Sequence, residues 1–267
     1  MIRDITIGQY YAADSVIHRL DPRLKLVVAV AYIVMLFLIE GPVAYATALA
    51  ALAVVIALSR VPVKFMLRGI QSIFLLIVLT GIINIFTNKT GTVLWGQGWY
   101  AITSGGLLFA AHIVLRLMML ILTSSLLTLT TTPIRLTDGI EYLLAPFGRV
   151  GVPYHEIAMM MTIALRFIPT LLDETDKIMK AQQARGADFE SGNLMQKAKS
   201  LVPVLVPLFL SAFRRAEELA TAMEARCYRG GEFRTKMNRM VFERRDYIAV
   251  VVMVVFLALE VILCIIG

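Results

Sequence analysis

Two arginines, Arg185 and Arg226, stand in nearly the same sequence setting. Arg185 lies in Ala184-Arg185-Gly186 and Arg226 lies in Ala225-Arg226-Cys227, and each follows a stretch with the pattern of an amphipathic helix. One such ending is structural, because a terminal arginine complements the helix dipole and a following glycine is a common C-cap. Two of them indicate a paired binding surface, since a planar guanidinium binds a carboxylate through two parallel hydrogen bonds. We therefore expect these six residues to contact two similar partners.

The other residues that could perform chemistry do not complete a catalytic or metal-binding pattern. His155-Glu156 begins a zinc-binding H-E-x-x-H sequence, but Met159 stands where the second histidine is needed. Glu217 and Glu218 follow two arginines on a charged helix, which favours a solvated ion-pair network. The sequence has neither a G-x-S-x-G elbow nor a G-x-x-x-x-G-K-[ST] phosphate loop. We predict no catalytic residue, no metal site and no directly bound cofactor, with an intramembrane enzyme as the less favoured alternative.

The elements that must position these residues are membrane helices. Of the 267 residues, 58% are hydrophobic and 17% are charged, whereas a typical soluble domain is about 25% charged. The mean hydropathy of +0.76 and the long apolar runs require lipid as their solvent. We therefore expect an all-α polytopic membrane protein with about five transmembrane helices. The predicted spans are 24–40, 43–59, 66–87, 105–130 and 247–266.

The distribution of Lys and Arg predicts the orientation of the chain. Basic residues precede the first span and occupy the turn after the second, whereas the loop after the third span holds only Lys89. Seventeen of the 26 Lys and Arg residues fall within 135–245. The positive-inside rule then places the N-terminus and 133–246 in the cytoplasm and the C-terminus outside. The same stretch holds 13 acidic residues, so its net charge of +4 suits an anionic membrane face rather than nucleic acid.

The predicted domains are an N-terminal membrane domain (1–132), a cytoplasmic helical coupling domain (133–246) and a C-terminal transmembrane helix (247–267). Within the middle domain we expect two long helices, 154–183 and 196–225, each apolar in its first half and charged in its second. Pro169 interrupts the first helix, and Pro203 and Pro207 interrupt the second. Short, interrupted apolar halves favour helices that lie along the membrane face. The alternative is a hairpin of two further spans, which keeps both termini in place.

Two charged residues, Arg116 and Glu260, are predicted to lie inside the membrane. Arg116 is 13 residues from Leu129 near the end of the fourth span, and Glu260 is 13 residues from Tyr247 at the start of the fifth. At about 1.5 Å per residue both are roughly 20 Å deep, where an isolated charge costs at least about 2.5 kcal/mol. We expect a structural ion pair, with His112 as a third member. The alternatives are snorkelling, a neutral side chain, or a contact with a partner subunit or the cytoplasmic domain.

The segment 15–26 (SVIHRLDPRLKL), directly before the first span, closely resembles the N-terminal signature of the transmembrane scaffold of energy-coupling factor (ECF) transporters. The two Ala-Arg endings resemble the coupling motifs of that family, with Cys227 where Gly or Ser is more familiar. Together with the span pattern, the resemblance covers nearly the whole chain. The segment also has a purely structural explanation, in which Asp21 caps the first span and Arg23 and Lys25 anchor it at the lipid interface.

The resemblance implies the T component of a vitamin or trace-nutrient importer in a prokaryotic cell membrane. Such a subunit joins two ABC-type ATP-binding subunits to a small substrate-capturing membrane protein, the S component, and transmits ATP-driven closure to it. ATP and Mg would be bound by the partners, Arg185 and Arg226 would each enter a groove on one ATP-binding subunit, and the apolar halves with Pro203 and Pro207 would contact the S component. A dedicated cobalt, nickel or biotin importer of the same family is the alternative.

Overall fold

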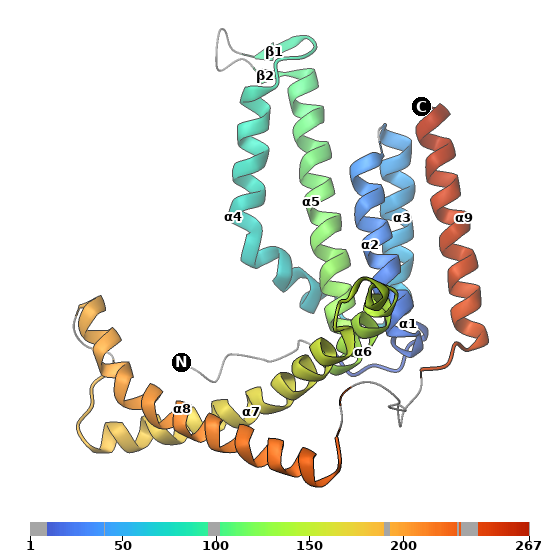
Figure 1. The fold of residues 1–267 in the computed structure, drawn as a ribbon. Helices are drawn as coiled ribbons and strands as arrows, with labels where there is room; N and C mark the ends of the chain where they lie inside the picture. Colours follow the sequence, from blue (N-terminus) through green and yellow to red (C-terminus); the bar gives the residue numbers. More distant parts are fainter. Residues whose placement is uncertain are drawn as a thin grey trace. The chain divides into compact units, whose positions relative to one another are not determined.

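A computed structural model describes residues 10–39, 41–95, 102–189, 193–228, 230 and 240–266. These residues form α-helices and one short β-hairpin (Figure 1), which confirms the all-α class. The elements are α1 (Val16–Arg19), α2 (Pro22–Leu38), α3 (Pro42–Ser59), α4 (Val63–Thr87), β1 (Val93–Trp95), β2 (Ile102–Thr103), α5 (Ser104–Thr130), α6 (Pro133–Leu144), the 3₁₀ helix η3 (Ala145–Val150), α7 (Tyr154–Ala184), α8 (Leu194–Ala225) and α9 (Arg244–Ile266).

The described residues fall into two compact units. One contains α1–α5 and α9, and the other contains η3, α7 and α8; the boundary lies within α6, after Gly139, and the chain rejoins the first unit at Met240. These boundaries lie seven residues from the predicted ones, 132 and 246, and the last helix was expected to form a domain of its own. In the structure α9 belongs with the first spans because it packs against α2 and α3.

The protein is a multi-pass membrane protein. Among the described residues, α3, α5, α7 and α9 are long and apolar enough to cross a membrane. The helix α4 is a fifth candidate if its two parts, which meet at a bend of 62°, form one span. The helix α2 has 17 residues, or about 25 Å, so it is shorter than the bilayer core of about 30 Å. The interpretation that α7 lies along the membrane face, and does not span the membrane, stays a prediction.

One hydrophobic core holds α2, α3 and α5 together, and Phe256 and Leu257 of α9 pack against it. Tyr32 of α2 donates a hydrogen bond through its hydroxyl to the carbonyl of Ala48 on α3, at 2.9 Å. The small side chain of Ala48 is fully buried, which lets the two helices approach closely. The buried residues of this core are Tyr32, Met35, Leu36, Ile39, Ala44, Tyr45, Ala48, Leu52 and Met119.

The β-hairpin connects α4 to α5 and depends on two glycines. Strand β1 pairs antiparallel with β2, and the hydroxyl of Thr103 accepts the N–H of Gly106 to cap α5. A Cβ on Gly105 would lie 2.4 Å from the carbonyl oxygen of Thr90, and one on Gly106 would lie 2.4 Å from that of Asn88. Only glycine fits this close backbone approach.

A buried carboxylate joins the start of the first span to the start of the last. Asp21 caps α2 by accepting the N–H of Arg23 at 2.8 Å, as the sequence predicted. The N–H of Asp21 itself donates to Oδ1 of Asp246 at 2.9 Å, and Oδ2 of Asp246 accepts the N–H of Glu243 at 2.9 Å. Asp246 is only 3% exposed, so both of its oxygens satisfy backbone donors that water does not reach.

Arg23 and Lys25 do not anchor the first span at the lipid interface, so that expectation was wrong. Both are buried, at 7% and 8% exposure. Lys25 Nζ donates to the carbonyls of His18 and Thr130, at 3.1 and 2.9 Å, and Arg23 donates to the carbonyl of Met240 at 3.3 Å. His18 and Thr130 lie in the last turns of α1 and α5, where carbonyls lack a helical donor. The basic residues of the 15–26 segment therefore join helix ends.

His18 of the same segment is buried and lies within hydrogen-bond distance of a partner at each ring nitrogen. Its Nε2 lies 2.9 Å from the carbonyl of Tyr11, which needs a donor, and its Nδ1 lies 2.7 Å from the hydroxyl of Ser15. Burial lowers the pKa of His18 below its ordinary value. When the pH falls below that ordinary value, the unfolded chain binds a proton at His18 more readily than the folded chain. Acidification therefore lowers the free energy of unfolding.

Candidate functional site

The helices α7 and α8 pack against each other in antiparallel directions (Figure 1). Two contacts set their register: Glu174 accepts hydrogen bonds from Ser211 and Arg215, and Gln182 donates to the carbonyl of Pro203. Residue numbers thus rise along α7 as they fall along α8. We take the point midway between these two contacts as the crossing of the helices. At about 1.5 Å per residue, it lies about 10 Å before the end of α7 and about 28 Å before the end of α8. The two Ala-Arg endings therefore stand at opposite ends of the pair, roughly 40 Å apart.

Both helices end in the same hydrogen-bonded geometry. In each, the residue after the arginine and the one following it donate backward to two carbonyls of the last turn, which is the Schellman motif. The sequence suggested the likeness through the Ala-Arg pairs alone, and the structure extends it to the backbone. The bonds are Gly186 to Gln183 (2.9 Å) and Ala187 to Gln182 (3.0 Å) after α7, and Cys227 to Glu224 (2.8 Å) and Tyr228 to Met223 (3.0 Å) after α8.

The two motifs present their arginines in the same way. Arg185 has φ −88° and ψ 5°, and Arg226 has φ −92° and ψ 12°. Both side chains are exposed, as are Ala184 and Ala225 beside them. Neither guanidinium has a hydrogen-bond or ion-pair partner among the residues that the structure describes. Each is therefore available to an external carboxylate.

The residue after each arginine is left-handed, and here the two motifs differ. Gly186 has φ +89° and Cys227 has φ +56°. Glycine adopts this conformation without cost, whereas a residue with a Cβ loses roughly 1–2 kcal/mol. The second motif is therefore locally strained at Cys227, the position at which the sequence departs from the family pattern.

Replacing Cys227→Gly should relieve that strain. We expect a stabilisation of about 0.5–1 kcal/mol, because the greater freedom of glycine in the unfolded chain offsets part of the gain. The measurement is the thermal unfolding midpoint of the detergent-solubilised protein. The matched control is Gly186→Ala, which introduces a Cβ at the equivalent left-handed position and should lower the midpoint. Equal losses in both variants would show that Cys227 is not strained.

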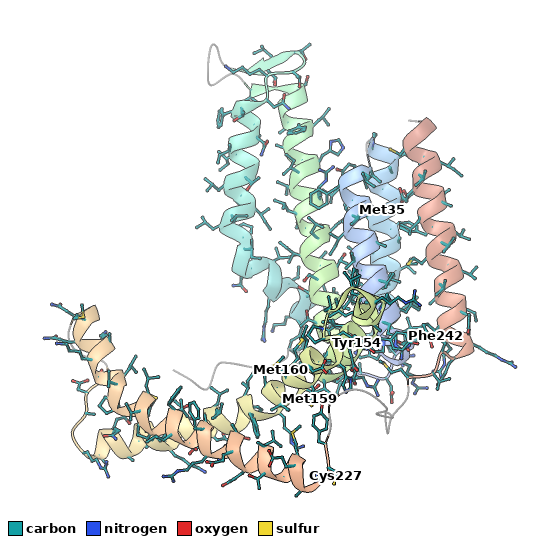
Figure 2. All side chains as sticks on the ribbon, viewed as in Figure 1. Met35, Tyr154, Met159, Met160, Cys227 and Phe242 are labelled. Atoms are coloured by element: carbon teal, nitrogen blue, oxygen red, sulfur yellow. The ribbon has the colours of Figure 1, made fainter. Side chains whose placement is uncertain are left out.

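The first halves of α7 and α8 expose many large apolar side chains. Figure 2 shows Met159 and Met160 in the first half of α7, while Cys227 follows the far end of α8. Pro203 is exposed and Pro207 is half-buried. These halves thus form an apolar surface with two prolines, as the sequence predicted. The exposed residues are Met160, Met161 and Ile168 on α7, and Leu201, Val202, Leu205, Val206, Phe209, Leu210 and Phe213 on α8.

Pro207 also creates a contact between the two helices. A proline has no backbone N–H, so the carbonyl of Pro203, four residues earlier, lacks its helical donor. The side-chain amide of Gln182 on α7 donates to this carbonyl at 3.4 Å. The prolines therefore serve the packing of α7 on α8 as well as the exposed surface.

Glu174 at the helix crossing was not predicted, and its partner Arg215 was expected to pair elsewhere. Arg215 was expected in a solvated network with Glu217 and Glu218, but its Nη2 lies 3.1 Å from Oε2 of Glu174 on α7. Ser211 donates to the other oxygen of Glu174 at 2.6 Å. The spacing of Ser211 and Arg215, one helical turn apart, was the available signal for a shared partner.

His155 forms no zinc motif with its neighbours. Its Nδ1 lies 3.0 Å from Oε1 of Glu141 on α6, and both side chains are largely buried. Within the described ranges, no group of three His, Cys, Asp or Glu side chains could hold a metal ion. His155 thus contributes to the packing of α6 against α7.

Arg116 and Glu260 do not form the expected ion pair in the structure. Arg116 donates to the hydroxyl of Tyr45 at 2.5 Å, and the hydroxyl of Thr47 donates to Glu260 at 2.7 Å. Tyr45 and Thr47 are two residues apart on α3, so the two charges do lie at similar depth. They bond to α3 instead of each other because α3 packs against both α5 and α9. His112 packs its ring on Tyr45, with centroids 4.9 Å apart.

Comparison with known proteins agrees with this architecture. The family model described as CbiQ, cobalt transport protein, matches residues 13–237. The chain is 56% identical over 257 residues to the "Energy-coupling factor transporter transmembrane protein EcfT" of Ruminiclostridium cellulolyticum, covering 96% of each chain. It is 58% identical to the protein of the same name from Thermosediminibacter oceani, covering 93% of each, and 46% identical to that of Bacillus subtilis, covering 97% of this chain and 98% of the relative.

These relatives match the chain over nearly its full length. The family model likewise spans the 15–26 segment, the core of α2, α3 and α5, and the α7–α8 pair. The chain therefore belongs to the CbiQ family and is a transmembrane T component of the energy-coupling factor transporters.

Proposed function

We propose that this chain is the scaffold of an importer for a vitamin or trace nutrient. It joins two ABC-type ATP-binding subunits to an S component and transmits ATP-driven closure to that component. ATP and Mg are bound by the ATP-binding subunits, and this chain has no catalytic role.

The observation that carries the proposal is the duplicated helix ending. Arg185 and Arg226 have the same backbone conformation, are exposed, and stand at opposite ends of one helix pair. Endings roughly 40 Å apart suit two separate subunits of similar shape better than one groove. A guanidinium in each groove would bind a carboxylate bidentately, and the adjacent alanine would let the backbones approach.

The apolar surface of α7 and α8 is suited to docking of the second proposed partner, the S component. Phe209, Leu210 and Phe213 are more than half exposed, which is unusual for large apolar side chains unless lipid or a protein covers them. A small membrane protein offers an equally apolar face. We infer that the S component docks on these halves, close to Pro203 and Pro207.

The proposed orientation follows from charge. Lys and Arg precede α2 and dominate 135–245, so the N-terminus and the α7–α8 pair face the cytoplasm, where ATP is available, and the C-terminus faces outward. This places both arginine endings on the side of the ATP-binding subunits.

Affinity purification tests the proposal. The chain, tagged at its C-terminus and isolated in mild detergent from its native host, should bring down two ABC-type ATP-binding subunits and at least one small membrane protein. Vesicles that contain the whole complex should accumulate nutrient only with ATP. Isolation of the intact chain without any ATP-binding subunit would contradict the proposal.

A further inference from the structure

We propose that Glu174, Ser211 and Arg215 form a clasp that fixes the point at which α7 and α8 cross, and that they are positioning residues for coupling. The inference rests on the proposed function, since it concerns how closure of the two ATP-binding subunits passes between the arginine endings. It adds a role for residues outside the two arginine endings.

The clasp uses both oxygens of one carboxylate. Oε1 of Glu174 accepts the Ser211 hydroxyl at 2.6 Å, and Oε2 accepts Nη2 of Arg215 at 3.1 Å. Ser211 and Arg215 are one turn apart on α8, so Glu174 is held at two points along that helix. Two contacts on one planar group resist sliding of one helix along the other.

A second point of attachment lies eight residues away on each helix. Gln182 donates to the carbonyl of Pro203, which Pro207 leaves without a helical donor. The residue pairs 174 with 211 and 182 with 203 share one antiparallel register. The clasp and this amide contact therefore fix one alignment over about 12 Å of helix.

The apolar residues of α8 near the crossing are unevenly buried. Val204 is 2% exposed and Leu208 is half-buried, whereas Leu205, Val206 and Phe209 are more than half exposed. Apolar packing is not directional, so polar contacts of fixed geometry set the alignment of the two helices. The clasp lies between the two arginine endings, so movement at one ending turns its helix about the clasp.

Charge exchange at the clasp tests this role. Glu174→Arg and Arg215→Glu, each alone, place like charges at the crossing and should lower nutrient uptake per ATP hydrolysed at least tenfold. Both ATP-binding subunits should still co-purify, because Arg185 and Arg226 are untouched. The combined exchange restores opposite charges and should recover at least a third of the wild-type ratio.

The milder variants and the control separate positioning from folding. Glu174→Gln keeps an oxygen for one hydrogen bond and should retain more coupling than Glu174→Ala. The matched controls are Arg214→Glu and Glu217→Arg, which reverse the charge of two exposed residues on the same helix. They should leave the uptake-to-hydrolysis ratio unchanged.

Normal coupling in both single clasp variants, with assembly intact, would overturn the clasp and leave the proposed function standing. Additive losses without recovery in the exchange variant would also overturn it. Absence of ATP-binding subunits from the wild-type complex would instead remove the proposed function.

Discussion

Arg185→Glu combined with Arg226→Glu should abolish nutrient uptake while the protein remains inserted in the membrane. Each substitution places a carboxylate where a groove is proposed to offer a carboxylate of its own. Loss of one partly buried, bidentate arginine contact costs roughly 2–5 kcal/mol when its acidic partner is left unpaired. That corresponds to roughly 30-fold to several-thousand-fold weaker binding at each ending. Single substitutions should be milder, because the other ending still holds one ATP-binding subunit.

The readouts are nutrient uptake by reconstituted vesicles and ATP hydrolysis by the assembled complex. Arg149→Glu is the matched control, since Arg149 is also an exposed arginine in the last turn of a helix and is followed by the left-handed Gly151. It should have no effect on uptake. Wild-type uptake by the doubly substituted protein would refute the assignment of both arginines.

Asp246→Ala should strongly destabilise the membrane unit. The substitution removes the acceptor for two buried backbone donors, the N–H groups of Asp21 and Glu243. Each buried donor left without a partner costs roughly 1–3 kcal/mol, so the expected loss is about 3 kcal/mol. The measurement is the thermal unfolding midpoint in detergent, where the last span should also become accessible to protease at its start.

Two variants bracket this effect. Asp246→Asn retains one acceptor oxygen and should lose about half as much stability as Asp246→Ala. Asp14→Ala removes an exposed carboxylate that pairs with Arg19 at the surface, and should change the midpoint little. If Asp246→Ala unfolds at the same temperature as Asp14→Ala, Asp246 does not join the first and last spans.

The sequence predicted the bounds of α7 and α8 closely. It placed them at 154–183 and 196–225, and the structure has them at Tyr154–Ala184 and Leu194–Ala225. Amphipathic periodicity carries through each helix, and the residues beyond Arg185 and Arg226 adopt the left-handed conformation that ends a helix. Local signals of this kind act within a few residues, so a sequence alone displays them.

The contacts that set helix alignment could not be predicted in the same way. Glu174 and Arg215 are 41 positions apart, and Asp21 and Asp246 are 225 apart. Residue counting gave the similar depth of Arg116 and Glu260, but it says nothing of how each helix is rotated about its axis. Rotation turns Arg116 to Tyr45 and Glu260 to Thr47, on either side of α3. Tertiary packing therefore decided the partners that sequence spacing left open.

Photocrosslinking from the two helix endings tests the central claim most directly. A benzophenone maleimide is attached to Cys227 in one protein and to Gly186→Cys in another that carries Cys227→Ser, both with Cys264→Ser. Thr92→Cys, in the connection between α4 and α5, serves as the control position. In the assembled complex, both endings should crosslink to an ATP-binding subunit, and a chain labelled at both endings should yield a product with two such subunits. Crosslinks to lipid or to the S component alone, from both endings, would contradict the account.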